Sequence, residues 1–520
     1  MNIRDIIENN DLVESMTGRA DIDIVGISND SRRIKNGFLF AARKGVNVDS
    51  NIYIEEAISK GASAILTDDA VIAEKFKNKD TVIIKVKDAL KAYAVISKNF
   101  FDNPAERLRI VGVTGTNGKT TTTFLIKSIL KAAGNNAGLI GTIDYEIGDN
   151  TTQSKNTTPD AYELNLLFSE TVKSGGGYCV MEVSSHSLAQ DRVFGVPFDV
   201  AVFTNLTRDH LDYHENMEKY YESKKKLFSE VLLKSSKNKK FAVINNDDRY
   251  GKRLIGELKD GFKKESKIDI LTYGLGEDSD IYACNINYYT DGLKLDIIFP
   301  GNNAIREIRS NLIGGYNVYN ILAAVSAAYV LSIAEDFIIS GIESLVNVPG
   351  RIEKVNTGDA DSPLICIDYA HTDDALKRVL SALKDIGGGR LISVFGCGGD
   401  RDKGKRPLMG KHSTDIADIS IITSDNPRSE DPLSIIREIE SGIKNALFAD
   451  KCLLKNDTGG HVYTIEEDRV NAIKLALTVA SKKDVVLIAG KGHEDYMIVK
   501  ENKFHFSDKE EVLKYYENRI

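Results

Sequence analysis

The sequence predicts an α/β protein built on doubly wound, mostly parallel sheets, and two observations lead to this fold class. Short apolar runs rich in β-branched residues alternate with segments of helical periodicity. Most of these runs lack the polar–apolar alternation of a half-exposed strand, which is typical of parallel strands that helices cover on both faces. The predicted strands lie at residues 109–114, 178–183, 199–205, 241–245, 363–368, 390–396, 418–424 and 484–490.

The length of 520 residues predicts several domains, since about 150 residues form one domain. Two proline-bearing segments, 101–107 and 346–351, mark the expected joints between them. We therefore expect a small N-terminal α/β domain at 1–105, a central domain at 106–346 and a C-terminal domain at 347–520. No repeat of fixed period is visible, which argues against a solenoid.

The composition excludes several classes of protein. The net charge of −8 argues against a protein whose main task is to bind nucleic acid. The N-terminus lacks the continuous apolar stretch of a signal peptide, and no apolar run approaches the roughly 18 residues that cross a bilayer. The five cysteines form no Cys-x-x-Cys pair, so neither a zinc knuckle nor a disulfide framework is expected. We expect a protein of a reducing compartment.

The strongest motif is the segment 114–121 (TGTNGKTT), which follows a predicted strand and opens a predicted helix. A glycine-rich turn lets backbone N–H groups and a helix N-terminus face a phosphate chain. Lys119 would reach the β- and γ-phosphates of a nucleotide, and the Thr120 hydroxyl would bind Mg²⁺. The spacing departs from strict GxxxxGK[ST], because Val113 occupies the first glycine position. The alternative is a glycine turn that only packs a helix on a sheet.

Polar residues also follow the next two predicted strands. Glu182 closes its strand at a position that suits a second oxygen ligand of Mg²⁺, although a strand-end glutamate with only structural partners is the plainer interpretation. The following strand leads into 208–214 (RDHLDYH). We expect five histidines to lie in strand-end loops rather than on helices, where open α/β sheets bind ligands, and we expect a metal or catalytic role for one or two of them. They are His186, His210, His214, His371 and His493.

The segment 218–228 predicts an amphipathic helix with three consecutive lysines. A lysine run of this kind is usually the solvated face of a helix. Spacing alone selects none of these lysines for a function.

Charged strand ends continue in the last third of the chain and predict a polar cleft there. Arg401 and Arg428 suit a carboxylate or a phosphate through bidentate hydrogen bonds, and Glu494 suits an ammonium group. Together they favour a zwitterionic ligand such as an amino acid, with solvated loops of incidental charge as the alternative. The strand ends lie at 368–371 (DYAH), 396–407 (GCGGDRDKGKRP), 424–432 (SDNPRSEDP) and 489–495 (AGKGHED).

The chain resembles the Mur ligases of peptidoglycan synthesis over nearly its whole length, in motifs that follow one another in the same order. These are TGTNGKTT, EVSSH, TNLTRDHLDYH, GGYNVYN, PGRIE, DYAHT and GKGHED. Within the family, GCGGDRDKGKRP and DNPR resemble the MurE type, which extends UDP-N-acetylmuramoyl-L-alanyl-D-glutamate. The DNPR form is associated with adding meso-2,6-diaminopimelate rather than L-lysine. Asp373 stands where many relatives have proline, which affects only local loop shape.

The resemblance implies a cytoplasmic, monomeric, ATP-dependent amide ligase that works through an acyl phosphate. It implies a UDP-substrate-binding N-terminal domain, a central P-loop ATP-binding domain and a Rossmann-like C-terminal domain that binds the amino acid. Contacts to ATP would come from Gly115, Thr116, Asn117, Gly118, Lys119, Thr120, Thr121, Asn317, Arg351 and Asp368. Contacts to the UDP-muramoyl dipeptide would come from Ser31, Asn156, Thr157, Thr158, Ser184, Gln190 and Arg192.

By the same resemblance, Mg²⁺ would be held by Thr120, Glu182, His210 and Lys224, the last as a carbamate formed with CO₂. The catalytic residues would be Lys119, Lys224 and His210. Diaminopimelate would be held by Arg401, Asp425, Asn426, Pro427, Arg428, Gly490 and Glu494.

Three other readings stay open at this point. A folylpolyglutamate or D-Ala-D-Ala-adding ligase would share the ATP loop but not DNPR and GCGGDRDKGK. A nucleotide switch or motor that only hydrolyses ATP would leave the charged cleft of the last domain unexplained. A non-enzymatic binding module would leave four residues without a purpose: Lys119, Thr120, Glu182 and His210.

Overall fold

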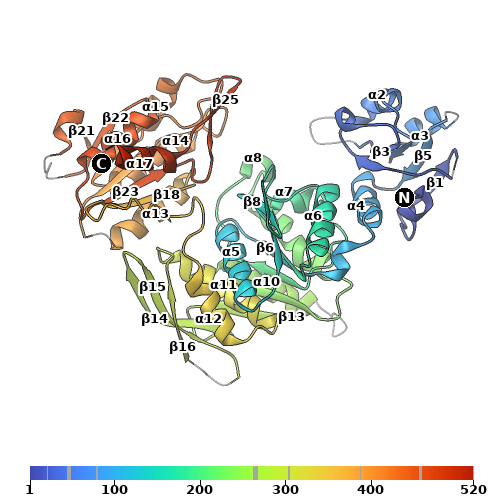
Figure 1. Cartoon of the computed structure of the whole chain (residues 1–520), viewed down its shortest axis with the longest axis horizontal. Helices are drawn as coiled ribbons and strands as arrows, with labels where there is room; N and C mark the ends of the chain where they lie inside the picture. Colours follow the sequence, from blue (N-terminus) through green and yellow to red (C-terminus); the bar gives the residue numbers. More distant parts are fainter. Residues whose placement is uncertain are drawn as a thin grey trace. The chain divides into compact units, whose positions relative to one another are not determined.

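The computed structural model describes residues 1–19, 21–43, 49–77, 80–261, 268–301, 305–386, 388–455 and 460–518. Within these residues the fold is α/β with mostly parallel sheets, as predicted, and its elements are labelled in Figure 1. The chain divides into two compact units. The first comprises Met1–Tyr282, Ile298–Ala304 and Tyr319–Gly341, and the second comprises Ala283–Ile297, Ile305–Val318 and Ile342–Ile520.

The first unit begins with a five-stranded sheet in the described part of the N-terminal segment. Its order is β1 (Val13–Thr17), β5 (Val82–Val86), β4 (Ala64–Thr67), β3 (Phe38–Ala41) and β2 (Gly26–Ser28). All neighbours run parallel except β1, which is antiparallel to β5. Its helices are α1 (Ile3–Ile7), α2 (Ile54–Ser59), α3 (Ala70–Phe76) and α4 (Ala89–Phe100), with 3-10 turns η1 (Ser31–Arg33), η2 (Ser50–Tyr53) and η3 (Pro104–Arg107).

The larger sheet of the first unit carries the phosphate-loop motif. Its parallel part has the order β13 (Ile268–Gly274), β12 (Lys240–Asn245), β11 (Val200–Phe203), β6 (Arg109–Thr114), β10 (Tyr178–Glu182) and β7 (Ala137–Ile140). The antiparallel strands β8 (Asp144–Ile147) and β9 (Asn150–Gln153) follow β7. The accompanying helices are α5 (Lys119–Ala132), α6 (Ala161–Lys173), α7 (Ser185–Ala189), α8 (Leu211–His214), α9 (Met217–Lys226), the π-helix η4 (Leu227–Leu232) and α10 (Arg249–Gly261).

In the seven-stranded sheet of the second unit, β17 is antiparallel to β18, and the other described neighbours run parallel. Its order is β17 (Glu353–Lys354), β18 (Leu364–Asp368), β23 (Val485–Ala489), β19 (Leu391–Phe395), β20 (Ile419–Ile422), β22 (Val462–Ile465) and β21 (Leu447–Phe448). Its helices are α13 (Asp373–Ile386), α14 (Lys405–Ile416), α15 (Pro432–Glu440), α16 (Arg469–Val479) and α17 (Asp508–Glu517), with the turn η5 (Lys451–Leu453).

The remaining described elements include a small hairpin. It is formed by β24 (Tyr496–Val499) and β25 (Asn502–His505) in the second unit. Strands β14 (Ile281–Tyr289), β15 (Gly292–Ile298) and β16 (Ile305–Ser310) are neighbours in that order. Helices α11 (Tyr316–Val330) and α12 (Glu335–Ser344) follow them along the chain.

All eight predicted strands are confirmed, and the cores explain why their sequences are apolar throughout. In β23, Leu487 belongs to the core on one face of the sheet, whereas Val486 and Ile488 belong to the core on the other face. When both faces of a strand are buried, side chains at all positions lie in apolar surroundings, so polar residues are not favoured at alternate positions. The helix predicted to begin at the 114–121 motif is α5.

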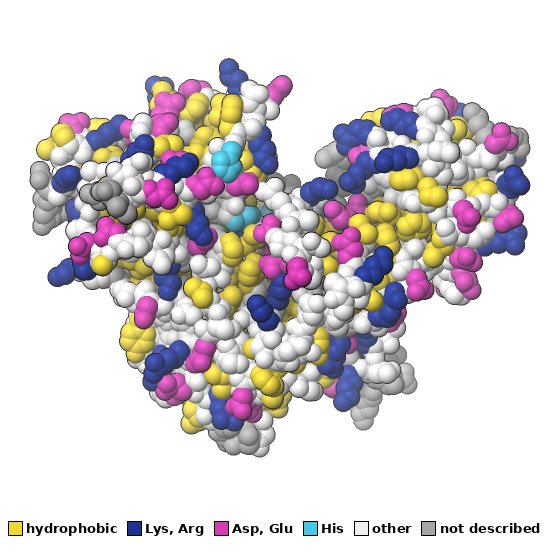
Figure 2. Space-filling view, in the orientation of Figure 1, with side chains coloured by type: hydrophobic (Ala, Val, Ile, Leu, Met, Phe, Trp, Pro, Cys, Tyr) yellow, Lys and Arg dark blue, Asp and Glu magenta, His cyan; other side chains and the backbone are white. Residues whose placement is uncertain are grey.

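On the face drawn in Figure 2, acidic and basic side chains of the described residues are interspersed. No helix in the described part of the chain is long and apolar enough to cross a membrane.

Candidate active site

The phosphate-loop motif lies at the carboxyl ends of three adjacent parallel strands. The loop 115–118 follows β6, Glu182 ends β10, and the segment after β11 begins at Thr204. Because β6 lies between β10 and β11, these three chain segments meet at one edge of the sheet, where open α/β sheets bind ligands. The Thr204 hydroxyl donates to Asn117 O at 2.6 Å, which ties the loop to the neighbouring strand end.

Two glycines shape the loop because no larger residue fits. Gly115 has φ +149°, and a Cβ there would lie 1.9 Å from the Thr204 hydroxyl oxygen. Gly118 has φ +86°, and a Cβ there would lie 2.2 Å from Asn320 Oδ1. The loop therefore approaches its neighbours as closely as backbone allows, and it leads directly into α5. The N-terminus of such a helix carries N–H groups suited to a phosphate chain.

We expect Gly115→Ala to weaken ATP binding at least tenfold, because the added methyl group must push the loop away from Thr204. Gly256→Ala is the matched control: Gly256 lies on α10, where a Cβ meets nothing within 4 Å, so alanine there adds helix propensity only. Titration calorimetry with a non-hydrolysable ATP analogue distinguishes the two variants. Equal affinities for wild type and Gly115→Ala would contradict the role of the loop.

Two lysines share one carbonyl oxygen of this loop. Lys119 Nζ lies 2.9 Å from Gly115 O and 2.8 Å from Thr116 O. Lys224 Nζ, from α9, donates to the same Gly115 O at 2.8 Å. Burial, and next the charge of Lys119, hold the pKa of Lys224 well below its ordinary value. A lowered pKa favours the neutral amine of a lysine, and the neutral amine is the form that reacts with CO₂.

The solvated-face interpretation of the lysine run is wrong for Lys224, which is only 1% exposed. The next residue, Lys225, fits that interpretation better, because it pairs with Glu222 at 3.1 Å and Glu257 at 3.0 Å. The side chains of successive residues in a helix point about 100° apart, so Lys224 can lie on the buried face of α9 while Lys225 lies on a more exposed face.

Glu182 and Thr120 supply adjacent oxygen atoms. The buried Glu182 carboxylate accepts from the Thr120 hydroxyl at 3.0 Å, and from the Thr142 amide at 2.8 Å and hydroxyl at 3.0 Å. Hydroxyl and carboxylate oxygens are the ligands that Mg²⁺ prefers, so this pair fits the predicted metal site. Among the described residues, no group of three or more His, Cys, Asp or Glu side chains is arranged to hold a metal ion.

Three histidines lie near Lys224, and two of them lie in helices instead of the predicted loops. His210 does follow β11 in a loop, but His186 lies in the short helix α7 and His214 in α8. The prediction of strand-end loops was wrong for these two because a single helical turn follows each loop. The His186 ring lies 4.9 Å from that of His210 and 5.5 Å from that of His214.

An aromatic wall connects these histidines to the lysine. The His214 ring stacks on Tyr220 at 5.1 Å, and the Tyr220 ring lies 4.7 Å from Lys224 Nζ. The Tyr220 hydroxyl reaches Thr116 Oγ1 at 3.2 Å. His210 adopts φ +52°, and its Nε2 lies 3.5 Å from the carboxylate of Asp209. The structure thus brings the predicted His210, Lys224 and phosphate loop into one neighbourhood.

Most residues predicted to contact the UDP-linked substrate form a connected group next to Glu182. Thr158 donates to Glu182 O at 2.9 Å and accepts from the Ser184 amide at 3.0 Å. Arg192 donates to Thr158 O at 2.8 Å and to Gln190 Oε1 at 2.8 Å.

Three further residues of that prediction are also described. The Thr157 hydroxyl lies 3.1 Å from that of Thr142, and Asn156 O accepts from the Tyr145 hydroxyl at 2.7 Å. Ser31 lies apart from this group in the N-terminal fold, where it donates to Glu56 at 3.2 Å.

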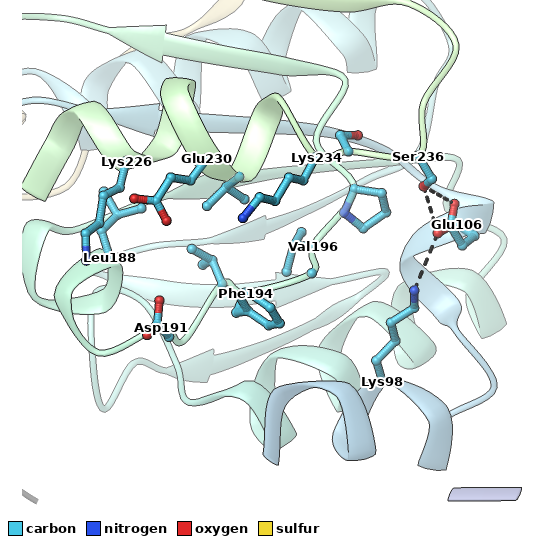
Figure 3. A pocket seen from close by; sticks show the side chains of 15 residues that line it. Lys98, Glu106, Leu188, Asp191, Phe194, Val196, Lys226, Glu230, Lys234 and Ser236 are labelled. Atoms are coloured by element: carbon cyan, nitrogen blue, oxygen red, sulfur yellow. Dashed lines mark hydrogen bonds and ion pairs between the residues drawn. The ribbon is translucent and has the colours of Figure 1, made fainter. Parts of the chain in front are cut away.

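A cavity of about 190 Å³ is lined mainly by residues from segments 188–197 and 226–236 (Figure 3). One wall is formed by Lys226, the last residue of α9, and by Glu230 and Lys234 farther along the chain; Phe194 and Val196 face this wall. None of the predicted site residues lines this cavity, so it is separate from the phosphate loop.

In the second unit, Asp368 ends β18 and holds the start of the C-terminal fold together. Its carboxylate accepts from the amides of Ile352 at 2.7 Å and Ala370 at 2.8 Å. Burial raises the pKa of Asp368 to about 6, although Arg351 opposes this shift. The Arg351 guanidinium lies 5.1 Å from the Tyr369 ring centre. Asn317, also predicted to contact ATP, is buried and donates to Ile313 O at 2.7 Å.

The four residues of DNPR and the loop of GKGHED meet at the carboxyl ends of β20 and β23. Asn426 Nδ2 donates to Glu494 Oε2 at 2.9 Å, and Asn426 Oδ1 accepts from Lys491 Nζ at 3.2 Å. Burial raises the pKa of Glu494. Gly490 has φ +114°, and a Cβ there would lie 2.4 Å from Asp425 Oδ2. The loops that carry these predicted residues therefore lie against one another.

The predicted arginines flank Gly398 of the GCGGDRDKGK loop. Arg428 Nη1 donates to Gly399 O at 2.7 Å. Gly399 also lies close to Pro427, since a Cβ there would lie 1.9 Å from Pro427 O. A Cβ at Gly398 would lie 2.9 Å from Arg428 Nη1 and 3.9 Å from Arg401 Cγ. Arg401 itself donates to Asp400 O at 3.1 Å and is exposed.

Sequence reasoning missed two parts of this site. The first is Lys491, which is fully buried between Asn426 and Glu494, although it stands inside the GKGHED motif. The second is the β24–β25 hairpin, which contacts the DNPR segment through the bond from Arg428 N to Ile498 O at 3.1 Å. No turn signal in the sequence marks this hairpin.

Comparison with known proteins gives the same family for three parts of the chain. Residues 23–101 match the catalytic domain of the Mur ligase family, residues 113–328 the Mur ligase middle domain, and residues 350–492 the glutamate ligase domain of Mur ligases.

Curated relatives match the chain over nearly its full length. The UDP-N-acetylmuramoyl-L-alanyl-D-glutamate–2,6-diaminopimelate ligase of Clostridium tetani is 44% identical over 96% of both chains. That of Geobacter metallireducens is 43% identical, over 95% of this chain and 94% of its own. A solved structure of a ligase with this name is 33% identical, covers 95% of each chain and has a TM-score of 0.68. The MurF ligase of Thermotoga maritima, solved with ADP, shares the fold at 21% identity and a TM-score of 0.61.

Proposed function

The chain belongs to the Mur ligase family, and we propose that it joins meso-2,6-diaminopimelate to the D-glutamate γ-carboxylate of UDP-N-acetylmuramoyl-L-alanyl-D-glutamate, at the expense of ATP. The observation that carries this proposal is that Asn426, Arg428 and Glu494 follow the carboxyl ends of strands in the same sheet, with Asn426 bonded to Glu494. The chain is also 44% identical to a ligase that is named for this reaction. The domains proposed for this task are 1–105, 106–346 and 347–520.

The reaction has two steps. An oxygen of the γ-carboxylate attacks the γ-phosphorus, the bond to ADP breaks, and an acyl phosphate forms. The amine of diaminopimelate then attacks the acyl carbon, loses a proton and displaces phosphate. Lys119, at the start of α5, faces the transferring phosphoryl group and offsets its charge, an electrostatic effect that needs no covalent chemistry from the protein.

The metal site is part of the proposal. Thr120, Glu182, His210 and Lys224 would hold Mg²⁺, with Lys224 as a carbamate. When bound, Mg²⁺ neutralises charge on the phosphoryl oxygens. Two observations support the carbamate: Lys224 is buried, and its pKa is lowered, which favours the neutral amine.

The amino-acid site would recognise both ends of diaminopimelate. The Arg428 fork would pair with the distal carboxylate, which L-lysine lacks, while Glu494 and Asn426 would take the ammonium and carboxylate of the other end. Arg428 would be left unpaired when lysine binds, and this disfavours lysine. We propose that the enzyme acts as a monomer in the cytoplasm, where ATP and UDP-linked sugars are available.

Isotope transfer tests the acyl-phosphate route. With both oxygens of the substrate's γ-carboxylate labelled as ¹⁸O, we expect mass spectrometry to find one labelled oxygen in each released phosphate. Unlabelled phosphate would mean that water attacks ATP directly, and would favour a simple ATPase. In Lys119→Met, we expect turnover about 10²- to 10³-fold lower, with the same labelling in the residual product.

A further inference from the structure

We infer that Arg469 is a positioning residue of the amino-acid site, because its guanidinium holds together the two loops that form it. This inference rests on the proposed function for the identity of the ligand. Arg469 is the first residue of α16, and its side chain is completely buried, yet neither composition nor motif singled it out.

The hydrogen bonds of Arg469 reach two strand ends that are not neighbours. Its Nη2 donates to Ala489 O at 3.0 Å, and its Nη1 donates to Ser424 O at a longer 3.3 Å. Ala489 ends β23 directly before Gly490, and Ser424 directly precedes Asp425. Strand β19 lies between β20 and β23, so the backbone ladder of the sheet does not join these two ends directly. The arginine side chain bridges them.

Asp508 fixes the orientation of this bridge. Its two carboxylate oxygens accept from Arg469 Nε at 2.7 Å and from Nη2 at 2.8 Å, and its side chain is also completely buried. A bidentate pair determines the plane of the guanidinium, so its remaining donors point in fixed directions. Asp508 starts α17, which makes the C-terminal helix part of the support.

The charge of Arg469 also acts on the site. Burial alone would lower its pKa, but Asp508, Asp425 and Glu494 together raise it. Two of these carboxylates belong to the proposed amino-acid site. The buried guanidinium therefore places a positive charge close to both loops of that site.

Loss of this bridge is expected to affect one substrate only. Misplacing binding groups by about 1 Å weakens the interactions that depend on their mutual geometry. We expect the KM for diaminopimelate to rise at least tenfold, while the KM values for ATP and the UDP-linked substrate change less than twofold.

The test replaces the ion pair without leaving a buried charge. In Arg469→Met/Asp508→Leu, two apolar side chains fill the space of the pair, a change that is often neutral for stability. The matched control is Arg390→Met/Asp484→Leu, since that pair, joined at 2.8 Å, lies at the amino ends of β19 and β23 in the same sheet. Arg469→Lys is the second variant: it keeps the charge beside Asp508 but lacks the fork that reaches both carbonyls.

Two readouts separate this inference from the proposed function. In wild type, product with diaminopimelate tests the function itself. In the variants, we expect a raised diaminopimelate KM and faster amide hydrogen exchange in segments 425–428 and 490–494, and neither change in the control. An unchanged KM and unchanged exchange in folded Arg469→Met/Asp508→Leu or Arg469→Lys would overturn the bridge, as would equal effects in the control. The exchange measurement decides the matter even if the ligand is not diaminopimelate.

Discussion

Lys224→Ala is expected to lower kcat about 10²- to 10³-fold while the affinity for ATP stays within a few-fold of wild type. The expected size of this decrease in kcat follows from the loss of one preorganised charge next to the transferring phosphoryl group. Lys224 is buried, lies 2.8 Å from Gly115 O in the phosphate loop, and has a lowered pKa caused first by burial. In the proposed function, this amine takes up CO₂, and the resulting carbamate is a ligand of Mg²⁺.

Chemical rescue distinguishes a carbamate from an ordinary lysine. Formate or acetate can enter the space left in Lys224→Ala and restore part of kcat. In Lys224→Arg the permanent cation fills that space, so we expect no rescue. Lys225→Ala is the matched control, because the adjacent lysine pairs with Glu222 and Glu257 at the surface and should retain full activity. Wild-type kcat in Lys224→Ala, measured by phosphate release, would contradict the proposed role.

Arg428→Ala is expected to raise the KM for diaminopimelate about 10²-fold, with little change in the KM for ATP. Truncating one partner of a buried charge pair costs on the order of 2–5 kcal/mol, and each 1.4 kcal/mol is about tenfold. Arg428 is held in place by its bond to Gly399 O at 2.7 Å and by the bond from its amide to Ile498 O at 3.1 Å.

Steady-state kinetics with each substrate varied in turn checks this expectation. Selectivity between diaminopimelate and L-lysine should shrink in the variant, because only diaminopimelate has the distal carboxylate. Arg437→Ala, an exposed position on α15, is the control and should leave every KM unchanged. A parallel rise in the KM values for ATP and diaminopimelate would argue against recognition by Arg428.

The strands and the strand-end position of the site could be predicted from the sequence, because both depend on local pattern. A continuous apolar run identifies a strand buried on both faces, as β23 illustrates, and parallel strands bring their carboxyl ends to one edge. Glycines such as Gly115 indicate from the sequence alone where the backbone can approach a neighbouring group closely.

The remaining features depend on tertiary packing. Nothing local distinguishes Lys224 from Lys225, because the face of α9 that enters the site is set by its neighbours. Arg469 and Asp508 are 39 residues apart, and their pairing follows from how α16 and α17 pack. Only family resemblance singled out Lys224, and no pattern singled out Arg469.

The most direct measurement of the central claim is phosphate release with ATP, Mg²⁺ and UDP-N-acetylmuramoyl-L-alanyl-D-glutamate. Parallel reactions contain meso-diaminopimelate, L-lysine or no amino acid, and product masses are determined for each. We predict phosphate release and a tripeptide product with diaminopimelate only. Phosphate release that needs no muramoyl substrate would contradict the ligase assignment, and preference for L-lysine would contradict the recognition assigned to Arg428.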